Sequence, residues 1–194
     1  MQVIVHIGTG KAGSTALQHS LRDDHQKLLE RGCLFPTFDG VLPPARQLLD
    51  AITRTEPPTG SATLWTKIRE QVEREKPEKL ILSNEHLWKH SDVAATMHDR
   101  LRSLGGDVRA FLYIREPLSY YRSVAQQALR STHHLPVPAL WRPPLNTHLE
   151  RLSKVFGAGL TVVPFQSSSL LGGGMLQDFA ARALSDETGQ IHLT

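Results

Sequence analysis

The sequence predicts an α/β protein, a three-layer α/β/α sandwich with a central parallel sheet. Short runs of aliphatic and β-branched residues alternate with longer segments of helical periodicity along all 194 residues. Strands that are separated by helices pair in parallel, because each crossover brings the chain back across the sheet in the same direction. In such sheets ligands bind beyond the carboxyl ends of the strands, so the residues that follow each strand carry most information about function.

Five short apolar runs have the composition of buried strands. They are rich in Val, Ile, Leu and Phe, and polar residues, glycine or proline bound them. We expect strands over residues 3–6, 33–35, 79–83, 108–114 and 160–163.

Seven segments have helical periodicity or helix-boundary signals. Pro77 ends one of them, and Gly105 and Gly106 close another. Pro117 opens a helix because proline is tolerated in the first turn, and an inward stripe is expected at Leu118, Tyr121, Ala125 and Ala128. We expect helices over residues 13–31, 45–53, 62–75, 91–104, 146–156 and 175–184, and from 117 onward.

Composition narrows the class of protein. Hydrophobic residues make up 40% of the chain and charged residues 21%, as in ordinary globular proteins. The single cysteine, Cys33, fits a reducing compartment, and no run approaches the ~20 apolar residues of a membrane span. The net charge is only +3 and the basic residues are scattered along the chain, which favours an anionic ligand over nucleic acid. We expect a cytoplasmic protein without a membrane span or a nucleic-acid partner.

Length predicts one domain over residues 1–194. Two segments rich in proline, residues 39–61 and 131–144, interrupt the regular pattern. Loops on a rigid scaffold commonly set specificity, so we expect these two segments to flank the binding cleft.

The bend after the first strand, "HIGTGKAGSTALQ" at residues 6–18, has three interpretations. Gly8, Gly10 and Gly13 match the dinucleotide pattern, but the expected ribose-binding acid is poorly placed at Asp39. The triphosphate-loop pattern needs lysine where Ser14 stands. Taken as it is, the bend offers backbone N–H groups, the hydroxyls of Ser14 and Thr15, and Lys11 to a single anionic group.

A second anion site is expected after the strand over residues 108–114. Arg115 ends that strand, and Ser123 follows eight residues later, about two helical turns along. A guanidinium makes a forked, charge-assisted contact with phosphate, so the two residues together suit a second phosphate.

These two motifs resemble those of the sulfotransferases that use 3′-phosphoadenosine 5′-phosphosulfate (PAPS). The resemblance covers residues 4–18 and 109–127 and implies a P-loop-NTPase-like fold without a required metal. It implies that the first loop binds the 5′-phosphosulfate and that Arg115 and Ser123 bind the 3′-phosphate, leaving the 3′,5′-bisphosphate nucleotide as product. The positions that match the first loop are Gly10, Lys11, Ala12, Gly13, Ser14, Thr15 and Gln18.

Sulfuryl transfer needs a cation beside the leaving oxygen and a base for the acceptor's proton. Lys11 is the expected cation. Glu85 follows the middle strand in "LILSNEHLWKH" and is the expected base, with His86 as second choice; a carboxylate that stabilises a helix start is the alternative role of Glu85.

We therefore expect transfer of a sulfuryl group to a hydroxyl, or to an amine, of a small molecule or glycan. One alternative is a kinase-like phosphotransferase with a degenerate loop, which would bind ATP with magnesium. The other is a nucleotide-binding module without catalytic activity.

Overall fold

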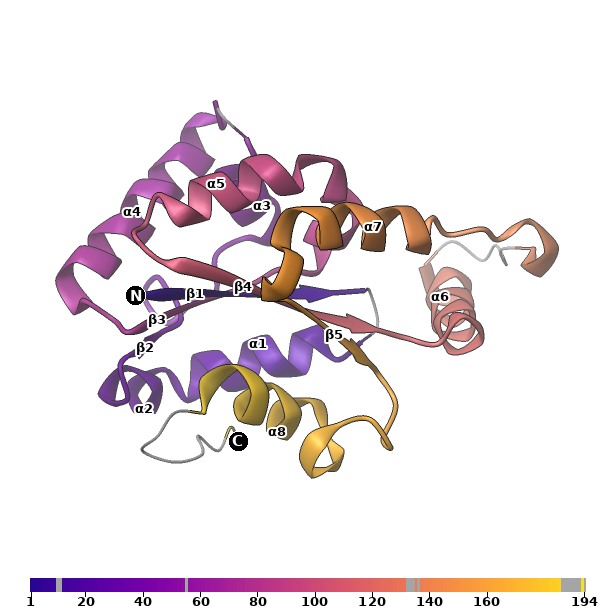
Figure 1. The fold of residues 1–194 in the computed structure, drawn as a ribbon. Coiled ribbons are helices and arrows are strands. Elements are labelled where there is room, and N and C mark those ends of the chain that lie inside the picture. The colour runs from indigo at the N-terminus through magenta and orange to yellow at the C-terminus, as the bar shows by residue number, and fades with distance from the viewer. Residues whose placement is uncertain (10–11, 55, 132–134, 136, 186–192, 194) are drawn as a thin grey trace.

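The computed structural model describes residues 1–9, 12–54, 56–131, 135, 137–185 and 193. Its centre is a sheet of five parallel strands in the order β2-β3-β1-β4-β5 (Figure 1). The strands are β1 (Gln2–Gly8), β2 (Cys33–Leu34), β3 (Lys79–Ser83), β4 (Asp107–Ile114) and β5 (Leu160–Pro164).

Helices cover both faces of this sheet and form the outer layers (Figure 1). On one face lie α3 (Ala45–Thr53), α4 (Thr59–Glu75), η1 (Glu85–Val93), α5 (Ala94–Arg102) and α7 (Leu145–Phe156). On the other lie α1 (Ser14–Asp23), α2 (His25–Glu30), α8 (Met175–Phe179) and the π-helical turn η5 (Ala180–Leu184). Short 3-10 turns are η2 (Pro138–Leu140), η3 (Gly157–Gly159) and η4 (Leu171–Gly173). The predicted three-layer α/β/α sandwich with a central parallel sheet is confirmed.

The alternation of side chains along β1 explains why both faces are covered. Val3, Val5 and Ile7 point into the core beneath α3, α4 and α5, whereas Ile4 points into the core above α1 and α8. All four side chains are completely buried. A strand that is apolar on both faces is stable only between two helical layers, which is why β1 occupies the middle of the sheet.

The register of β1 brings the carboxyl ends of three strands together. His6 pairs with Ser83 at the end of β3, and Gly8 pairs with Tyr113 near the end of β4. Thr9 continues the contact, since its N–H and its Oγ1 hydroxyl both donate to the Tyr113 carbonyl, at 3.3 and 2.9 Å. The segments that follow β1, β3 and β4 therefore emerge at one edge.

A buried polar network attaches the C-terminal helices to the sheet. The Tyr113 hydroxyl donates to Asp178 Oδ2 at 2.8 Å, and Asp178 Oδ1 accepts from Arg182 Nε at 2.8 Å and from the Leu171 N–H at 2.7 Å. Burial, and next the bond to Asp178, raise the pKa of the Tyr113 hydroxyl. The phenol stays protonated and gives the buried carboxylate a donor.

Several helix boundaries differ from the sequence-based expectation. The helix expected over residues 13–31 is divided at Asp24 into α1 and α2. The one expected from residue 91 begins at Glu85 as the 3-10 turn η1, which is kinked at His90 before α5 continues. These segments are helical as expected, but the breaks at Asp24 and His90 are marked by no glycine or proline in the sequence.

Helix α6 (Pro117–Ser131) departs most from expectation. It lies beyond the end of β4, to the side of the sheet (Figure 1), so it has no broad sheet face to cover. Leu118, expected on an inward stripe, is 52% exposed, whereas Ala125 of the same stripe is buried. The rings of Tyr120 and Tyr121 pack on Trp141 instead. Their centroids lie 5.3 and 5.4 Å, respectively, from the centroid of the Trp141 ring.

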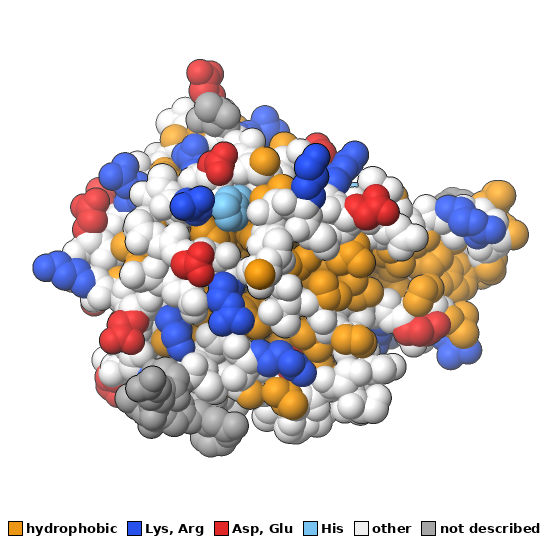
Figure 2. Space-filling model, in the orientation of Figure 1, with side chains coloured by type: hydrophobic (Ala, Val, Ile, Leu, Met, Phe, Trp, Pro, Cys, Tyr) orange, Lys and Arg blue, Asp and Glu red, His pale blue; other side chains and the backbone are white. Residues whose placement is uncertain are grey.

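The two segments expected to be irregular are partly helical. Residues 39–61 contain α3 and the first residues of α4, and 131–144 contain the short turn η2. An apolar surface is visible in Figure 2 in the area where Figure 1 places α6, α7 and β5. Within the described residues, every helix is too short or too polar to span a lipid bilayer.

Candidate functional site

The bend between β1 and α1 is built around two glycines. Gly13 has φ 79°, in the left-handed region, and a Cβ atom there would lie 2.7 Å from Met175 Sδ. A Cβ atom at Gly8 would overlap the Ser14 hydroxyl. The left-handed backbone of Gly13 therefore favours glycine, and a side chain at Gly8 would displace the Ser14 hydroxyl.

The N-terminus of α1 has the donors of an anion site. Gly13 precedes the helix and offers no side-chain cap, and the first-turn N–H groups of a helix lack intrahelical acceptors. Ser14 is buried, and within the described residues its Oγ has no hydrogen-bond partner. Thr15 is exposed beside it. A buried hydroxyl without a partner next to a helix N-terminus is a favourable place for a negatively charged oxygen.

Of the positions expected in the first loop, Gly10 and Lys11 lie outside the described residues. Ala12 is completely buried among the residues that cover α1, so its contribution to a ligand is its backbone.

Arg115 lies at the same edge of the sheet, and Phe165 connects it to the bend. The Arg115 guanidinium carbon lies 5.4 Å from the centroid of the Phe165 ring, within cation–π range. A Cβ atom at Gly13 would lie 3.5 Å from Cε2 of the same ring. The Phe165 N–H donates to the Ile114 carbonyl at 2.7 Å, which holds the residue at the end of the sheet. Phe165 thus lies between the two expected anion sites.

Ser123 lies in α6 and is half-buried. Glu116 fixes the start of this helix, because its carboxylate accepts from the backbone N–H of Ser119 at 2.8 Å and of Leu118 at 3.0 Å. These two hydrogen bonds lower the pKa of Glu116, and the bond from Ser119 has the larger effect. The cap sets the direction in which α6 leaves Arg115.

On the other side of β1, Gln18 joins α1 to the end of β3. Its Nε2 donates to Glu85 Oε2 at 3.2 Å and also lies 3.2 Å from Ser83 Oγ and 3.3 Å from the Ser83 carbonyl. Two residues expected to act separately, Gln18 and Glu85, are therefore in direct contact. The amide fixes one carboxylate oxygen of Glu85.

His6 continues this network into the core. Its Nδ1 lies 2.8 Å from Ser83 Oγ, and its ring packs against Tyr113 and Phe179. Complete burial lowers the pKa of His6 to about 3, so the imidazole is neutral at physiological pH. The Ser83 hydroxyl thus joins Gln18 on the surface side to the neutral imidazole of His6 in the core.

Glu85 begins η1, as its alternative role as a helix-start carboxylate requires. Asn84 holds this turn in place: its Oδ1 accepts from the His86 N–H at 2.9 Å, and its Nδ2 donates to the Ala45 carbonyl at 2.7 Å. His86 Nε2 lies 4.0 Å from Glu85 Oε1, and both side chains are partly exposed. The two candidate bases are therefore adjacent and open to a ligand.

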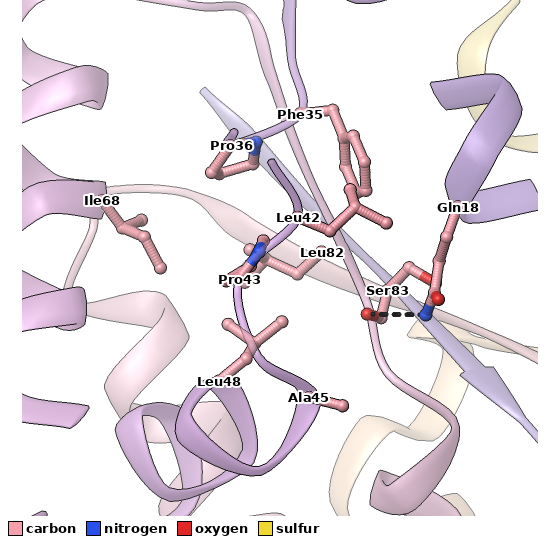
Figure 3. A pocket seen from close by; sticks show the side chains of 10 residues that line it. All are labelled: Gln18, Phe35, Pro36, Leu42, Pro43, Ala45, Leu48, Ile68, Leu82 and Ser83. Carbon is pink, nitrogen blue, oxygen red and sulfur yellow. Dashed lines mark hydrogen bonds between the residues drawn. The ribbon is translucent and has the colours of Figure 1, made fainter. Parts of the chain in front are cut away.

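A small cavity adjoins this network at Gln18 and Ser83. Figure 3 shows Gln18 and Ser83 at one end and apolar side chains around the remainder. Its volume is about 30 Å³. The apolar part of the wall includes Phe35, Leu42, Leu48, Ile68 and Leu82.

Sequence reasoning missed two features of the site. Phe165 follows the last expected strand, residues 160–163, but no sequence pattern assigned it a role, since its contacts depend on β5 pairing with β4. The His6–Ser83 contact joins residues 77 positions apart and follows only from the register of β1 and β3.

Comparison with known proteins gives likenesses to solved structures, two of which are described below. No family model and no curated protein matches the chain. A sulfotransferase from Alicyclobacillus acidocaldarius aligns with a TM-score of 0.47 and 14% identity over 84% of this chain and 72% of that one. The tunicamycin resistance protein of Deinococcus radiodurans aligns with a TM-score of 0.45 and 16% identity over 95% of this chain and 96% of that one. These values are too low to assign a reaction.

Replacing Gly13 by alanine tests the packing of the bend. Gly40→Ala is the matched control, because Gly40 has φ 73° but a Cβ atom there would meet nothing within 4 Å. We expect Gly40→Ala to lower the free energy of unfolding by about 1–2 kcal/mol, the cost of a left-handed alanine. Gly13→Ala should lose more because Met175 must move, as measured by urea denaturation. Equal losses would show that Met175 does not restrict the bend.

The burial of His6 predicts a pH-dependent stability. The pKa of His6 is about 3 in the fold, against 6.5 for an unperturbed histidine. The unfolded chain therefore binds a proton below pH 6.5 that the folded chain does not, and stability is lost as pH falls from 6.5 toward 3. Between pH 7 and pH 5 the free energy of unfolding should fall by about 2 kcal/mol more than in His6→Gln. Parallel pH profiles for the two proteins would contradict this.

Proposed function

We propose that this protein is a sulfotransferase that transfers a sulfuryl group from PAPS to a hydroxyl of an acceptor. The observation that carries the proposal is the placement of Phe165 between the bend at Gly13 and the guanidinium of Arg115. Two groups suited to anions therefore lie one aromatic ring apart, on the edge where a parallel sheet binds its ligands.

The described residues fit the 5′ end of this nucleotide. Ser14 has a buried hydroxyl without a partner among the described residues, and it begins a helix of ten residues with an uncapped N-terminus. Thr15 adds an exposed hydroxyl. Gly13 and Ala12 contribute backbone, and the roles of Gly10 and Lys11 are carried over from the sequence.

Arg115 and Ser123 would hold the 3′-phosphate. The Phe165 ring supports the Arg115 guanidinium from one side, which restricts its motion and leaves its N–H donors to a ligand. When bound, the nucleotide would supply the sulfuryl group, which passes to the acceptor oxygen as the bond from sulfur to the 5′-phosphate breaks.

Glu85 is the base in this proposal. The Gln18 amide donates a hydrogen bond to Glu85 Oε2, so Glu85 Oε1 is the oxygen that takes the proton of the acceptor hydroxyl. His86 Nε2 lies 4.0 Å from Oε1, beyond hydrogen-bond distance but near enough for a charged imidazole to stabilise the carboxylate. Gln18 is a positioning residue: it holds Glu85 at the end of β3 without touching the acceptor.

Removal of the Arg115 guanidinium tests the nucleotide site. We expect Arg115→Ala to weaken binding of adenosine 3′,5′-bisphosphate about 10- to 100-fold, the usual value of a charge-assisted phosphate contact. Isothermal titration calorimetry measures the change. Arg102→Ala is the control, since Arg102 is exposed at the end of α5, away from the site. If the two variants bind the nucleotide as tightly as the parent, the site assignment is wrong.

Replacement of Glu85 by glutamine tests the base. We expect Glu85→Gln to keep the nucleotide affinity, because Glu85 lies on the acceptor side, and to slow sulfuryl transfer about 10²- to 10⁴-fold. Release of the bisphosphate nucleotide in the presence of PAPS and a panel of alcohols and phenols reports the rate. His86→Gln is the paired variant: a large loss there with full activity in Glu85→Gln would assign the base to His86.

A further inference from the structure

The cavity beside Gln18 is polar at one end only. Gln18 and Ser83 form that end, and the other lining residues are apolar (Figure 3). No charged side chain lines the cavity among the described residues. A hydroxyl held at the polar end would find hydrogen-bond partners, whereas a second polar group farther in would find none.

This polar end belongs to the same network as the proposed base. The Gln18 Nε2 atom that donates to Glu85 Oε2 also lies 3.2 Å from Ser83 Oγ. A molecule with its hydroxyl at Glu85 and its carbon atoms beyond Gln18 and Ser83 would enter the cavity with its apolar part first.

The size of the cavity limits what enters. Its volume of about 30 Å³ is small beside the roughly 150 Å³ of an engineered apolar cavity that holds benzene. This is about the space of one methyl-sized group, so the terminal methyl of an unbranched chain fits without rearrangement, whereas a sugar ring does not.

Leu42 and Pro43, which follow a small hairpin, separate the cavity from a second hollow. Phe38 and Val41 exchange backbone hydrogen bonds at 2.9 and 3.0 Å around Asp39 and Gly40, both of which have positive φ. Leu42 follows the hairpin and lines the cavity as well as a groove of about 420 Å³ beside α4. The apolar lining thus continues on the outer side of the wall.

We propose that this cavity binds the apolar end of the acceptor, and that the acceptor is a monohydroxy alcohol with an unbranched alkyl end. The inference rests on the proposed function for the identity of the reaction, but the binding site is tested separately from it. A glycan is excluded as the group that enters the cavity, because its further hydroxyls would be buried without partners.

Ala45 offers a substitution that fills the cavity. It is half-buried in the first turn of α3, and its side chain lines the cavity (Figure 3). Ala45→Leu adds three carbon atoms there, and leucine is a good helix former. Ala62→Leu is the matched control, because Ala62 is a half-buried helical alanine of α4 that does not line the cavity.

The test measures equilibrium binding of 1-butanol and 1,4-butanediol to the nucleotide-free protein by saturation-transfer NMR. We expect the parent and Ala62→Leu to bind 1-butanol at least tenfold more tightly than the diol, and Ala45→Leu to lose 1-butanol binding while keeping the parent's unfolding temperature. Equal binding of the two compounds, or unchanged 1-butanol binding by Ala45→Leu, would overturn the inference. If Ala45→Leu is unstable, Ala45→Val is measured with the same criteria.

A transfer assay with PAPS and 1-butanol separates this inference from the proposed function. Transfer by the parent that Ala45→Leu reduces at least tenfold in kcat/KM, with unchanged nucleotide affinity, supports both. Butanol binding that Ala45→Leu abolishes, with no transfer by the parent to any alcohol, supports the cavity and contradicts the sulfotransferase reaction.

Discussion

The hydrogen bonds that hold β1 between β3 and β4 determine where the polar groups of the candidate site lie. Parallel pairing brings His6 beside Ser83 and Gly8 beside Tyr113, so that the segments after all three strands meet at one edge. The bend around Gly13, the carboxylate of Glu85 and the guanidinium of Arg115 each follow one of these strands. A slip of one residue would turn the side chains of β1 to the opposite helical layers and dismantle both the core and this edge.

The site combines a rigid interior with an open rim. Inside, His6, Ser83 and Gln18 form a hydrogen-bonded chain that ends at Glu85. A neutral imidazole suits this position because an ionised one would be costly to bury. At the rim, Arg115 and Glu85 remain partly exposed. This division fits a transferase, in which a fixed scaffold orients a base and anion-binding groups toward ligands that enter from solvent.

The sequence predicted the fold class and the edge at which the candidate site lies, because hydrophobic runs, glycines and prolines act locally. It also indicated Gln18, Glu85 and Arg115, though without their contacts. It did not indicate the role of Phe165 or the partner of His6, since both depend on strand order and register. It misplaced Leu118 because a helical stripe does not reveal that α6 lies beyond the sheet. The cavity wall likewise needs residues from α1, β3, α3 and α4 together.

The central claim is that one nucleotide spans the bend at Gly13 and the guanidinium of Arg115. Isothermal titration calorimetry of the unmodified protein with adenosine 3′,5′-bisphosphate, adenosine 5′-monophosphate and ATP, with and without magnesium, tests it most directly. The account predicts that the bisphosphate binds at least tenfold more tightly than the monophosphate, because only the bisphosphate reaches Arg115, and that magnesium does not change its affinity. Equal affinity for the bisphosphate and the monophosphate, or tight binding of ATP that requires magnesium, would contradict the account.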